Sequence, residues 1–190
     1  MPFEWFRRLE IPDVVLVKYT VFEDPRGFFA ELYKRTDFLA NGIPYDFVQL
    51  NLSYSKPRVV RGLHYQLRPY EQGKLVYVIR GRVFDVAVDL RRGSPWFGKH
   101  VAAVLEPGMA LWIPPGFAHG FQALEETLLL YLVTKEYAPR YERCVAWNDP
   151  ELGIDWPIRE GVMLSERDAR CPPLREAETN FEYYPAQPSS

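Results

Sequence analysis

Residues 108–121 read GMALWIPPGFAHGF, which predicts two short strands on either side of a tight Pro114-Pro115-Gly116 turn. Proline ends a strand because it has no backbone N–H to donate, and Gly108 and Gly116 allow turn conformations that other residues avoid. His119 follows three residues after the turn, on the second strand. The stretch therefore indicates two strands that meet at the mouth of a β-barrel, with a histidine beside the turn.

Similar short strands extend in both directions from this stretch. In residues 84–90, Asp85, Ala87 and Asp89 alternate with larger apolar residues, which is the period of a half-buried strand, and Arg80-Gly81-Arg82 is typical of a hairpin. The expected strands span residues 14–20, 28–33, 47–54, 59–66, 74–79, 83–90, 100–105, 110–113, 117–124 and 127–134, with short helices near residues 36–40 and 166–169. This pattern predicts a mainly β fold, which could be a sandwich, a barrel or a jelly roll.

The bulk composition is that of an ordinary globular domain. The chain has 190 residues, of which 47% are hydrophobic and 25% charged. We expect one domain over residues 1–175 and an extended C-terminal tail over residues 176–190. The formal net charge of -2 provides no global field that favours nucleic acid or a membrane surface. The sequence shows no secretory signal and no apolar run long enough to span a bilayer, so we expect a cytoplasmic protein.

The two cysteines, Cys144 and Cys171, are not spaced as a metal-binding or redox motif. Disulfides are rare in reducing compartments. We therefore expect two free thiols.

Two candidate catalytic groups lie on consecutive predicted strands. His64 belongs to the segment RGLHYQ, residues 61–66, and Lys74 begins the next strand. A histidine can take a proton near neutral pH, and a lysine can stabilise the negative oxygen that forms when a proton is removed next to a ketone. The alternative is that His64 is a hydrogen-bonded core histidine and Lys74 a charge on an edge strand.

The spacing of Gly108, Pro114-Pro115-Gly116 and His119 resembles the second sequence motif of cupins, which implies a cupin-type jelly-roll barrel of antiparallel strands. Metal-binding cupins usually take ligands from an H-x-H pair, a glutamate and a later histidine. Here Tyr65 and Gln66 follow His64, and Lys74 takes the place of the carboxylate. An ammonium group repels a bound cation, so we expect no metal and no cofactor.

Over residues 11–173 the chain resembles the dTDP-4-dehydrorhamnose 3,5-epimerases, which are cupin-fold enzymes. The blocks that carry the resemblance are DPRGFFAE (24–31), QLN (49–51), RGLHYQ (61–66), QGKLV (72–76), DVAVDLR (85–91), SPWFG (94–98), IPPGFAHGF (113–121) and WNDP (147–150). The resemblance implies epimerisation of dTDP-4-dehydro-6-deoxy-D-glucose at C3 and C5 to dTDP-4-dehydro-L-rhamnose, in dTDP-rhamnose biosynthesis.

The same resemblance implies roles for individual residues. His64 would be the general base, Tyr131 the general acid, Asp168 the hydrogen-bond partner of His64, and Lys74 the group that polarises the C4 carbonyl. The residues implied to line the nucleotide-sugar site are Arg26, Phe29, Glu31, Gln49, Asn51, Arg61, His119, Tyr137, Glu142 and Arg167. Phe29 and Tyr137 are the candidates to sandwich the thymine. Because the strand that carries Phe29 and Glu31 often acts across the subunit interface in this family, a homodimer is expected.

Structural alternatives exist for two of these residues. Tyr131 lies in the apolar run LLLYL, residues 128–132, where a tyrosine often belongs to the core. Asp168 follows Ser165 by three residues, the spacing of a helix N-cap and its partner.

Other activities share much of this pattern. They are a C3-only or C5-only epimerase of another dTDP-deoxysugar pathway, a sugar 3,4-ketoisomerase, a metal-dependent cupin oxygenase, and a non-catalytic nucleotide-sugar-binding cupin. The missing H-x-H pair argues against the oxygenase, and the co-occurrence of His64, Lys74, Tyr131 and Asp168 argues against the binding protein.

Overall fold

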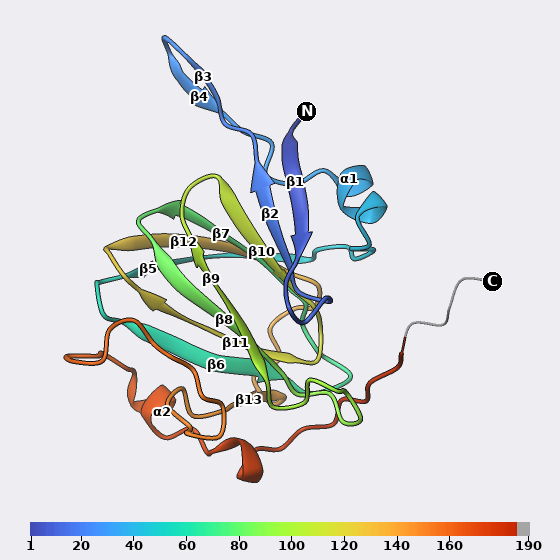
Figure 1. The fold of residues 1–190 in the computed structure, drawn as a ribbon, viewed down its shortest axis with the longest axis vertical. Helices are drawn as coiled ribbons and strands as arrows, with labels where there is room; N and C mark the ends of the chain where they lie inside the picture. The colour runs from blue at the N-terminus through green and yellow to red at the C-terminus, as the bar shows by residue number, and fades with distance from the viewer. Residues whose placement is uncertain (186–190) are drawn as a thin grey trace.

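Two antiparallel sheets face each other in the computed structural model, which describes residues 1–185 (Figure 1). The six-stranded sheet has the order β1-β2-β10-β7-β12-β5, and the five-stranded sheet has the order β13-β6-β11-β8-β9. The strands are β1 (Phe3–Arg8), β2 (Val15–Tyr19), β3 (Phe22–Asp24), β4 (Gly27–Phe29), β5 (Gln49–Ser55), β6 (Val60–Gln66), β7 (Lys74–Arg80), β8 (Val83–Asp89), β9 (His100–Leu105), β10 (Met109–Ile113), β11 (Phe117–Ala123), β12 (Thr127–Val133) and β13 (Glu142–Cys144). The helices are α1 (Arg35–Ala40), α2 (Glu166–Ala169) and the 3-10 helix η1 (Leu174–Glu176).

The prediction of a mainly β antiparallel barrel with a few short helices is confirmed. Three strands were not expected from the sequence, namely β1, β3 and β13. β3 and β13 have three residues each, too few for an alternating pattern to stand out. The strand expected over residues 28–33 ends at Phe29, so Glu31 lies outside it.

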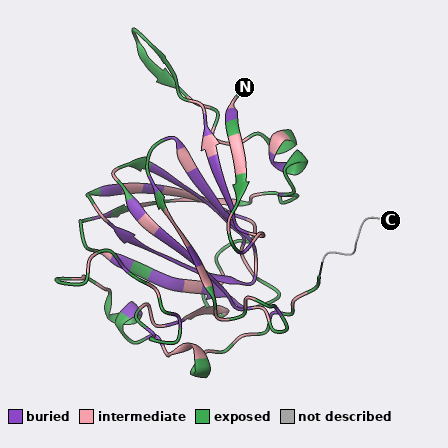
Figure 2. Ribbon diagram, viewed as in Figure 1, coloured by how far each residue is buried: buried purple, intermediate pink, exposed green. Residues whose placement is uncertain are grey.

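The barrel interior is filled by apolar residues from both sheets. Val76 and Val78 of β7, Leu111 of β10, Phe121 of β11 and Leu129 of β12 belong to one buried cluster between the sheets. A second cluster covers the outer face of β7, where Tyr77 packs with Phe38 of α1 and with Trp112. Strand β7 is therefore buried along most of its length (Figure 2). Its first residue, Lys74, is one of the buried residues.

The expectation of two free thiols is wrong, because Cys144 and Cys171 form a disulfide. Cys144 ends β13, and Cys171 lies just after α2, with the two Cα atoms 5.5 Å apart. The residues are 27 apart in sequence, and only the folding of α2 back onto the barrel brings them together. The sequence argument used the expected compartment and the motif spacing, neither of which reports this proximity.

The C-terminal segment returns along the barrel. Tyr65 donates a hydrogen bond to the carbonyl oxygen of Glu178 at 2.6 Å, and the backbone N–H of Arg92 donates to the carbonyl oxygen of Phe181 at 2.9 Å. The Phe181 side chain is buried in the cluster that covers the outer face of the five-stranded sheet. The segment up to residue 183 therefore packs against the barrel, and residues 186–190 of the expected tail lie outside the described part of the chain.

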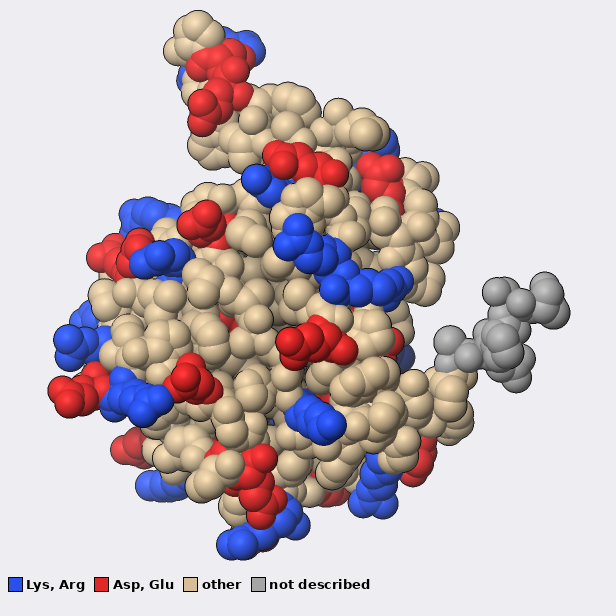
Figure 3. Space-filling view, viewed as in Figure 1, with Lys and Arg blue, Asp and Glu red and all other residues tan. Residues whose placement is uncertain are grey.

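The surface carries charges of both signs. On the face drawn in Figure 3, Lys and Arg are interspersed with Asp and Glu, as the small net charge suggests. Within residues 1–185, no helix is both long enough and apolar enough to cross a bilayer.

Candidate functional site

A cavity of about 230 Å³ lies at one end of the barrel, and both sheets contribute to its walls. Its lining residues are Gln49, Asn51, His64, Tyr65, Gln66, Gln72, Lys74, Tyr131, Tyr137 and Glu142. Seven of these are among the residues implied by the sequence resemblance: His64, Lys74, Tyr131, Gln49, Asn51, Tyr137 and Glu142.

Strand register explains why three of the lining residues share one wall. Tyr131 on β12 lies opposite Asn51 on β5 and opposite Val76 on β7. Lys74 is two residues before Val76, so its side chain emerges on the same face of the sheet as Tyr131 and Asn51. His64 comes from β6 in the facing sheet. The cavity therefore has an imidazole on one wall and a phenol and an ammonium on the other.

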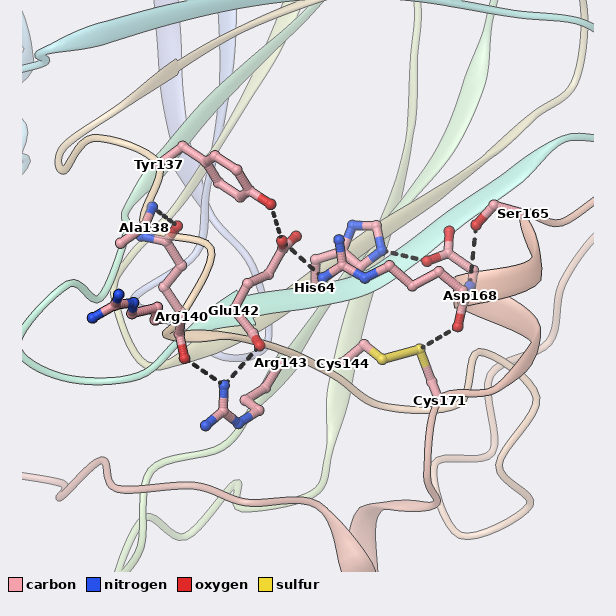
Figure 4. A network of polar contacts seen from close by, with 12 residues as sticks. His64, Tyr137, Ala138, Arg140, Glu142, Arg143, Cys144, Ser165, Asp168 and Cys171 are labelled. Atoms are coloured by element: carbon pink, nitrogen blue, oxygen red, sulfur yellow. Dashed lines mark hydrogen bonds and ion pairs between the residues drawn. A yellow bond between two sulfur atoms is a disulfide. The ribbon is translucent and has the colours of Figure 1, made fainter.

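His64 is paired with a buried carboxylate. The Nε2 atom of His64 lies 2.6 Å from Oδ1 of Asp168 (Figure 4). Oδ2 of Asp168 accepts a 3.2 Å hydrogen bond from the backbone N–H of Gly62. Burial raises the pKa of Asp168, but the hydrogen bonds from His64 and Gly62 and the charge of Arg167 outweigh it, and the net shift is downward. Because an ionised carboxylate only accepts hydrogen bonds, Nε2 of His64 carries the hydrogen, and Nδ1 is left as a proton acceptor.

Asp168 also keeps the structural role that its spacing from Ser165 suggested. Ser165 is the N-cap of α2, and its Oγ accepts a 3.1 Å hydrogen bond from the backbone N–H of Asp168. The two roles coexist because the cap uses the backbone of Asp168 and the histidine uses its carboxylate.

Gly62 allows β6 to approach β11 closely beside His64. Its φ is +120°, and a Cβ at this position would lie 2.6 Å from the Cα of Gly120. A Cβ at Gly120 would in turn lie 2.7 Å from the carbonyl oxygen of Arg61. Both distances are far below van der Waals contact, so any larger residue here would push the two strands apart and displace His64.

Lys74 is buried in a central strand, not placed at a sheet edge. Strand β7 lies between β10 and β12, and the Lys74 side chain is almost fully buried. Burial lowers the pKa of Lys74 to about 8, although the negative charges of Glu142 and Asp85 act in the opposite direction. An ammonium group in such a setting interacts strongly with nearby charge because little water screens it.

Tyr131 lines the cavity and keeps its proton well above neutral pH. Burial raises the pKa of Tyr131, and the positive charge of Arg61 only partly opposes this. The phenol is therefore a potential proton donor throughout the physiological range.

A chain of hydrogen bonds and one ion pair connects five of the expected binding residues beside the cavity. Nε2 of Gln49 donates to Oδ1 of Asn51 at 2.9 Å, and Oε1 of Gln49 accepts from the backbone N–H of Tyr137 at 2.9 Å. The Tyr137 hydroxyl donates to Glu142 at 2.6 Å (Figure 4). Arg167 pairs with the same carboxylate at 2.8 Å.

Two expected arginines lie at a second hollow next to the first. This hollow of about 340 Å³ is lined by Arg61, Arg167, Ser165 and Asp168 among others, and His64 belongs to the walls of both cavities. Arg61 is held by hydrogen bonds to Oγ of Ser55 at 3.0 Å and to the carbonyl oxygen of Tyr54 at 2.8 Å. A positively charged hollow therefore adjoins the histidine.

The chain's own fold does not bring every expected residue to this site. Arg26 and Phe29 lie on the β3–β4 hairpin, which projects away from the barrel, and Glu31 lies in the exposed chain just after it (Figure 1). Arg26 pairs there with Asp24 at 2.6 Å. His119 is buried beneath the cavity and does not line it.

Comparison with known proteins shows the family of this chain. The sequence model of the dTDP-4-dehydrorhamnose 3,5-epimerase family matches residues 8–176. The chain belongs to this family.

The matches to named relatives extend over almost the whole length of this chain. The dTDP-4-dehydrorhamnose 3,5-epimerase of Pseudomonas aeruginosa is 53% identical over 175 residues, which are 90% of this chain and 96% of the relative. The crystal structure of the Sulfolobus tokodaii enzyme of the same name has a TM-score of 0.87 at 51% identity and covers 96% of this chain and 100% of its own. The Legionella pneumophila dTDP-6-deoxy-D-glucose-3,5-epimerase, solved with dTDP-4-keto-L-rhamnose, has a TM-score of 0.90 at 40% identity. The match covers 94% of this chain and 98% of the Legionella chain.

Asp85 is a residue of the epimerase site region that the sequence analysis did not single out. Its Oδ1 lies 2.8 Å from Nε2 of His119, its side chain is fully buried, and its charge acts on Lys74. Oδ2 of Asp85 has no hydrogen-bond partner among residues 1–185. The sequence signal that could have found Asp85 is a carboxylate between apolar residues on β8, the strand that pairs with β11, which carries His119.

Tyr65, Gln66 and Gln72 also line the cavity without having been expected there. Gln66 braces the surrounding loops, because its Nε2 donates to the carbonyl oxygen of Tyr70 at 2.7 Å and its Oε1 accepts from the backbone N–H of Ala138 at 2.8 Å. No group of three or more His, Cys, Asp or Glu side chains in the described residues is arranged to hold a metal ion.

Proposed function

We propose that this epimerase acts on dTDP-4-dehydro-6-deoxy-D-glucose at C3 and C5 and yields dTDP-4-dehydro-L-rhamnose, in the biosynthesis of dTDP-rhamnose. One observation carries the proposal. The His64–Asp168 pair lies on one wall of the cavity, and Tyr131 and Lys74 lie on the facing sheet. A sugar ring between the walls would meet a base on one side and an acid on the other.

Proton abstraction is the first step of the proposed reaction. The C4 ketone acidifies the hydrogens on C3 and C5. Nδ1 of His64 takes one of these hydrogens as a proton, while Asp168 accepts the hydrogen bond from Nε2 and stabilises the imidazolium. The electrons of the broken C–H bond move into an enolate with its charge on O4, and the ammonium group of Lys74 stabilises that charge.

Reprotonation from the other wall completes the inversion. The hydroxyl of Tyr131 gives its proton to the carbon from the face opposite His64, and the enolate returns to the ketone. The phenolate regains a proton and the imidazolium loses one, so each cycle is neutral overall. Each acid or base of this kind typically contributes about 10²–10⁴-fold to the rate.

The hollow beside His64 is proposed to bind the diphosphate. Arg61 and Arg167 both line it, and guanidinium groups suit phosphate oxygens because they donate two parallel hydrogen bonds. On binding, Arg167 would exchange part of its ion pair with Glu142 for contact with the ligand.

A homodimer is proposed from two features of the surface. Strand β5 is the edge of its sheet, and its outward residues Leu50, Leu52 and Tyr54 are exposed and apolar, as is Val48 just before it. Edge strands with such a face are usually covered by another protein surface. The β3–β4 hairpin cannot serve its own cavity, so Arg26 and Phe29, with Glu31 just after it, are proposed to reach the cavity of a second copy.

The experiment that tests the activity is incubation of the protein with dTDP-4-dehydro-6-deoxy-D-glucose in heavy water, followed by NMR of the sugar. We expect deuterium at both C3 and C5 and the L-rhamno configuration in the product. Deuterium at one carbon only would replace the proposal with a C3-only or C5-only epimerase. Loss of the C4 ketone would indicate a ketoisomerase, and no exchange at all would refute an epimerase of this substrate.

The homodimer is tested by mixing two impaired variants. His64→Ala removes the base from a cavity, and Phe29→Ala with Arg26→Ala removes the hairpin's side chains. A mixed dimer pairs the intact cavity of one variant with the intact hairpin of the other, so activity should rise above that of either variant alone. If each variant stays as inactive after mixing and exchange of subunits, the hairpin does not act across an interface.

A further inference from the structure

Helix α2 carries Asp168 to His64 without any apolar anchor of its own. It has four residues, and Asp168 is the only buried one. Glu166, Arg167 and Ala169 are exposed. A single helical turn is unstable by itself, and packed helices usually depend on an apolar face. Apolar packing reaches this segment only at its flanks, where Leu164 and Leu174 pack, partly buried, against the cluster on the outer face of the five-stranded sheet.

Polar contacts supply only part of what is needed. The flanks of the segment are fixed by backbone hydrogen bonds, from Met163 N–H to the carbonyl oxygen of Arg58 at 3.0 Å and from Ala146 N–H to that of Pro172 at 2.8 Å. Between these points the turn has the bonds of Asp168 itself and the ion pair of Arg167 with Glu142. The Arg167 side chain is half-exposed in that pair, and pairs of this kind contribute little because water screens them.

The disulfide is attached at the two ends of the Asp168–His64 contact. Cys144 on β13 lies directly opposite His64 in the pairing of β13 with β6. Cys171 follows Asp168 by three residues, and its backbone N–H donates to the carbonyl oxygen of Asp168 at 3.4 Å. Figure 4 shows the bridge running beneath the carboxylate and the imidazole. It thus joins the strand beside the base to the turn that carries its partner.

We propose that the Cys144–Cys171 disulfide is a positioning device that holds Asp168 against His64, which makes the rate of proton abstraction depend on the oxidation state of these two cysteines. The inference rests on the proposed function of the pair. A dithiol reductant would give two electrons and two protons to the bridge, leaving two thiols and a disulfide of its own. Strands β7 and β12, which carry Lys74 and Tyr131, lie in the other sheet and hold neither cysteine, so they would keep their places.

The experiment compares four forms of the full chain, each oxidised and after reduction with dithiothreitol. They are the wild type, Cys144→Ser/Cys171→Ser, Asp168→Ala, and the triple variant. Free thiols are counted by alkylation and mass spectrometry, and kcat is measured from deuterium exchange into the sugar. We expect reduction to lower kcat of the wild type by about 10- to 100-fold, the scale on which small misplacements of catalytic groups slow enzymes. The serine pair should be equally slow and indifferent to the reductant.

The Asp168→Ala variant separates positioning from a general structural role. If the bridge acts through Asp168, reduction should have no further effect once the carboxylate is gone, which is the non-additivity expected of two groups in one unit. If reduction lowers kcat of Asp168→Ala by the same factor as it lowers kcat of the wild type, the proposal is overturned. So would a fully reduced wild type with unchanged kcat, or reduction that unfolds the chain, seen as loss of near-ultraviolet circular dichroism.

A second readout is independent of turnover. The N–H proton of His64 bound to Asp168 should give a low-field ¹H NMR signal in the oxidised protein, absent in Asp168→Ala and weakened on reduction. Its persistence at full strength in the reduced protein would also refute the inference. An oxidised wild type that shows this signal but exchanges no deuterium would instead refute the proposed function and leave the positioning role of the bridge intact.

Discussion

His119 lies directly opposite His64 where β11 pairs with β6, and the Nε2 atom of each imidazole contacts a carboxylate, Asp85 for His119 and Asp168 for His64. The two pairs differ in access. The His64 side chain is 28% exposed and lines the cavity, whereas that of His119 is 8% exposed and lies beneath it. Burial, above all, lowers the pKa of His119 and keeps it neutral. The same kind of histidine–carboxylate pair is thus open to the cavity at one position and enclosed in the barrel at the other.

Replacement of the base should abolish exchange at both carbons. We expect His64→Asn to lower kcat for deuterium incorporation at C3 and at C5 by about 10²–10⁴-fold, the usual contribution of a general base. His100→Asn is the matched control, because His100 lies on β9 outside the cavity and, within residues 1–185, its ring hydrogen-bonds only to the carbonyl oxygen of Leu152. Equal rates for His64→Asn and the wild type would show that another group takes the proton.

His119→Asn should mainly lower the free energy of unfolding. The change leaves the buried carboxylate of Asp85 with a shorter partner, and an unsatisfied buried acceptor costs about 1–3 kcal/mol. Urea unfolding measures this loss. A stability equal to that of the wild type would mean that the Asp85 contact contributes nothing to the fold.

Tyr131→Phe should separate proton removal from inversion. His64 and Lys74 remain, so hydrogen at C3 and C5 should still exchange with solvent, while the yield of inverted product falls by about 10²-fold or more because no acid stands on the opposite face. NMR of the sugar in heavy water reports both events at once. Tyr70→Phe is the control, since Tyr70 lies outside the cavity. Wild-type inversion by Tyr131→Phe would assign the acid to another group.

Lys74 should determine the alkaline limb of the pH profile. Burial lowers its pKa to about 8, so the free enzyme loses the ammonium charge as the pH rises through that value. The pKa of Tyr131 is raised by burial and lies above this range. We therefore expect kcat/KM to fall above about pH 8, and Asp85→Asn to move the limb to lower pH because the charge of Asp85 favours the protonated lysine. A limb that stays in place in Asp85→Asn would assign it to a different group.

The same shift has a defined sign for stability. The unfolded lysine has its ordinary pKa of 10.5, so between about pH 8 and that value the unfolded chain binds the proton more tightly than the folded chain. The free energy of unfolding should therefore increase, and the folded state become more stable, as the pH rises through this window. Lys74→Met removes the contribution, and the comparison of its unfolding at pH 7.5 and pH 10 with that of the wild type measures it.

Sequence patterns predicted most of the strands, and they singled out two side chains, His64 and Lys74, that line the cavity. Alternation and turn residues predicted β6 to β12 to within a residue or two, and His64 and Lys74 lie on neighbouring stretches of sequence. Asp168, by contrast, is 104 residues from His64, and only the resemblance to a family connected them. Register decided that Tyr131 shares a face with Lys74, and register is not encoded in either strand alone.

Strand β8 shows why Asp85 was missed. The alternation has the expected period, but both faces of the strand are buried. Val86 and Val88 pack against the C-terminal segments on the outer side of the sheet, while Ala87 belongs to the barrel interior. Asp85, two residues before Ala87, therefore faces inward, where it meets His119. The sequence could not show this, because the cover of the outer face comes from residues about 60 positions later in the chain, such as Val145 and Leu152.

Loss of the disulfide should lower global stability as well as activity. The bridge closes a loop of 27 residues, and the entropy removed from the unfolded chain by such a loop corresponds to about 3–4 kcal/mol. We expect Cys144→Ser/Cys171→Ser to unfold at a lower urea concentration by this amount, with an unchanged m-value if the folded states bury the same surface. Reduced wild type is the matched control, because it lacks the covalent bond but keeps both sulfur atoms. If reduced wild type is as stable as the oxidised protein while the serine pair is not, the loss comes from packing of the sulfur atoms and not from the bond.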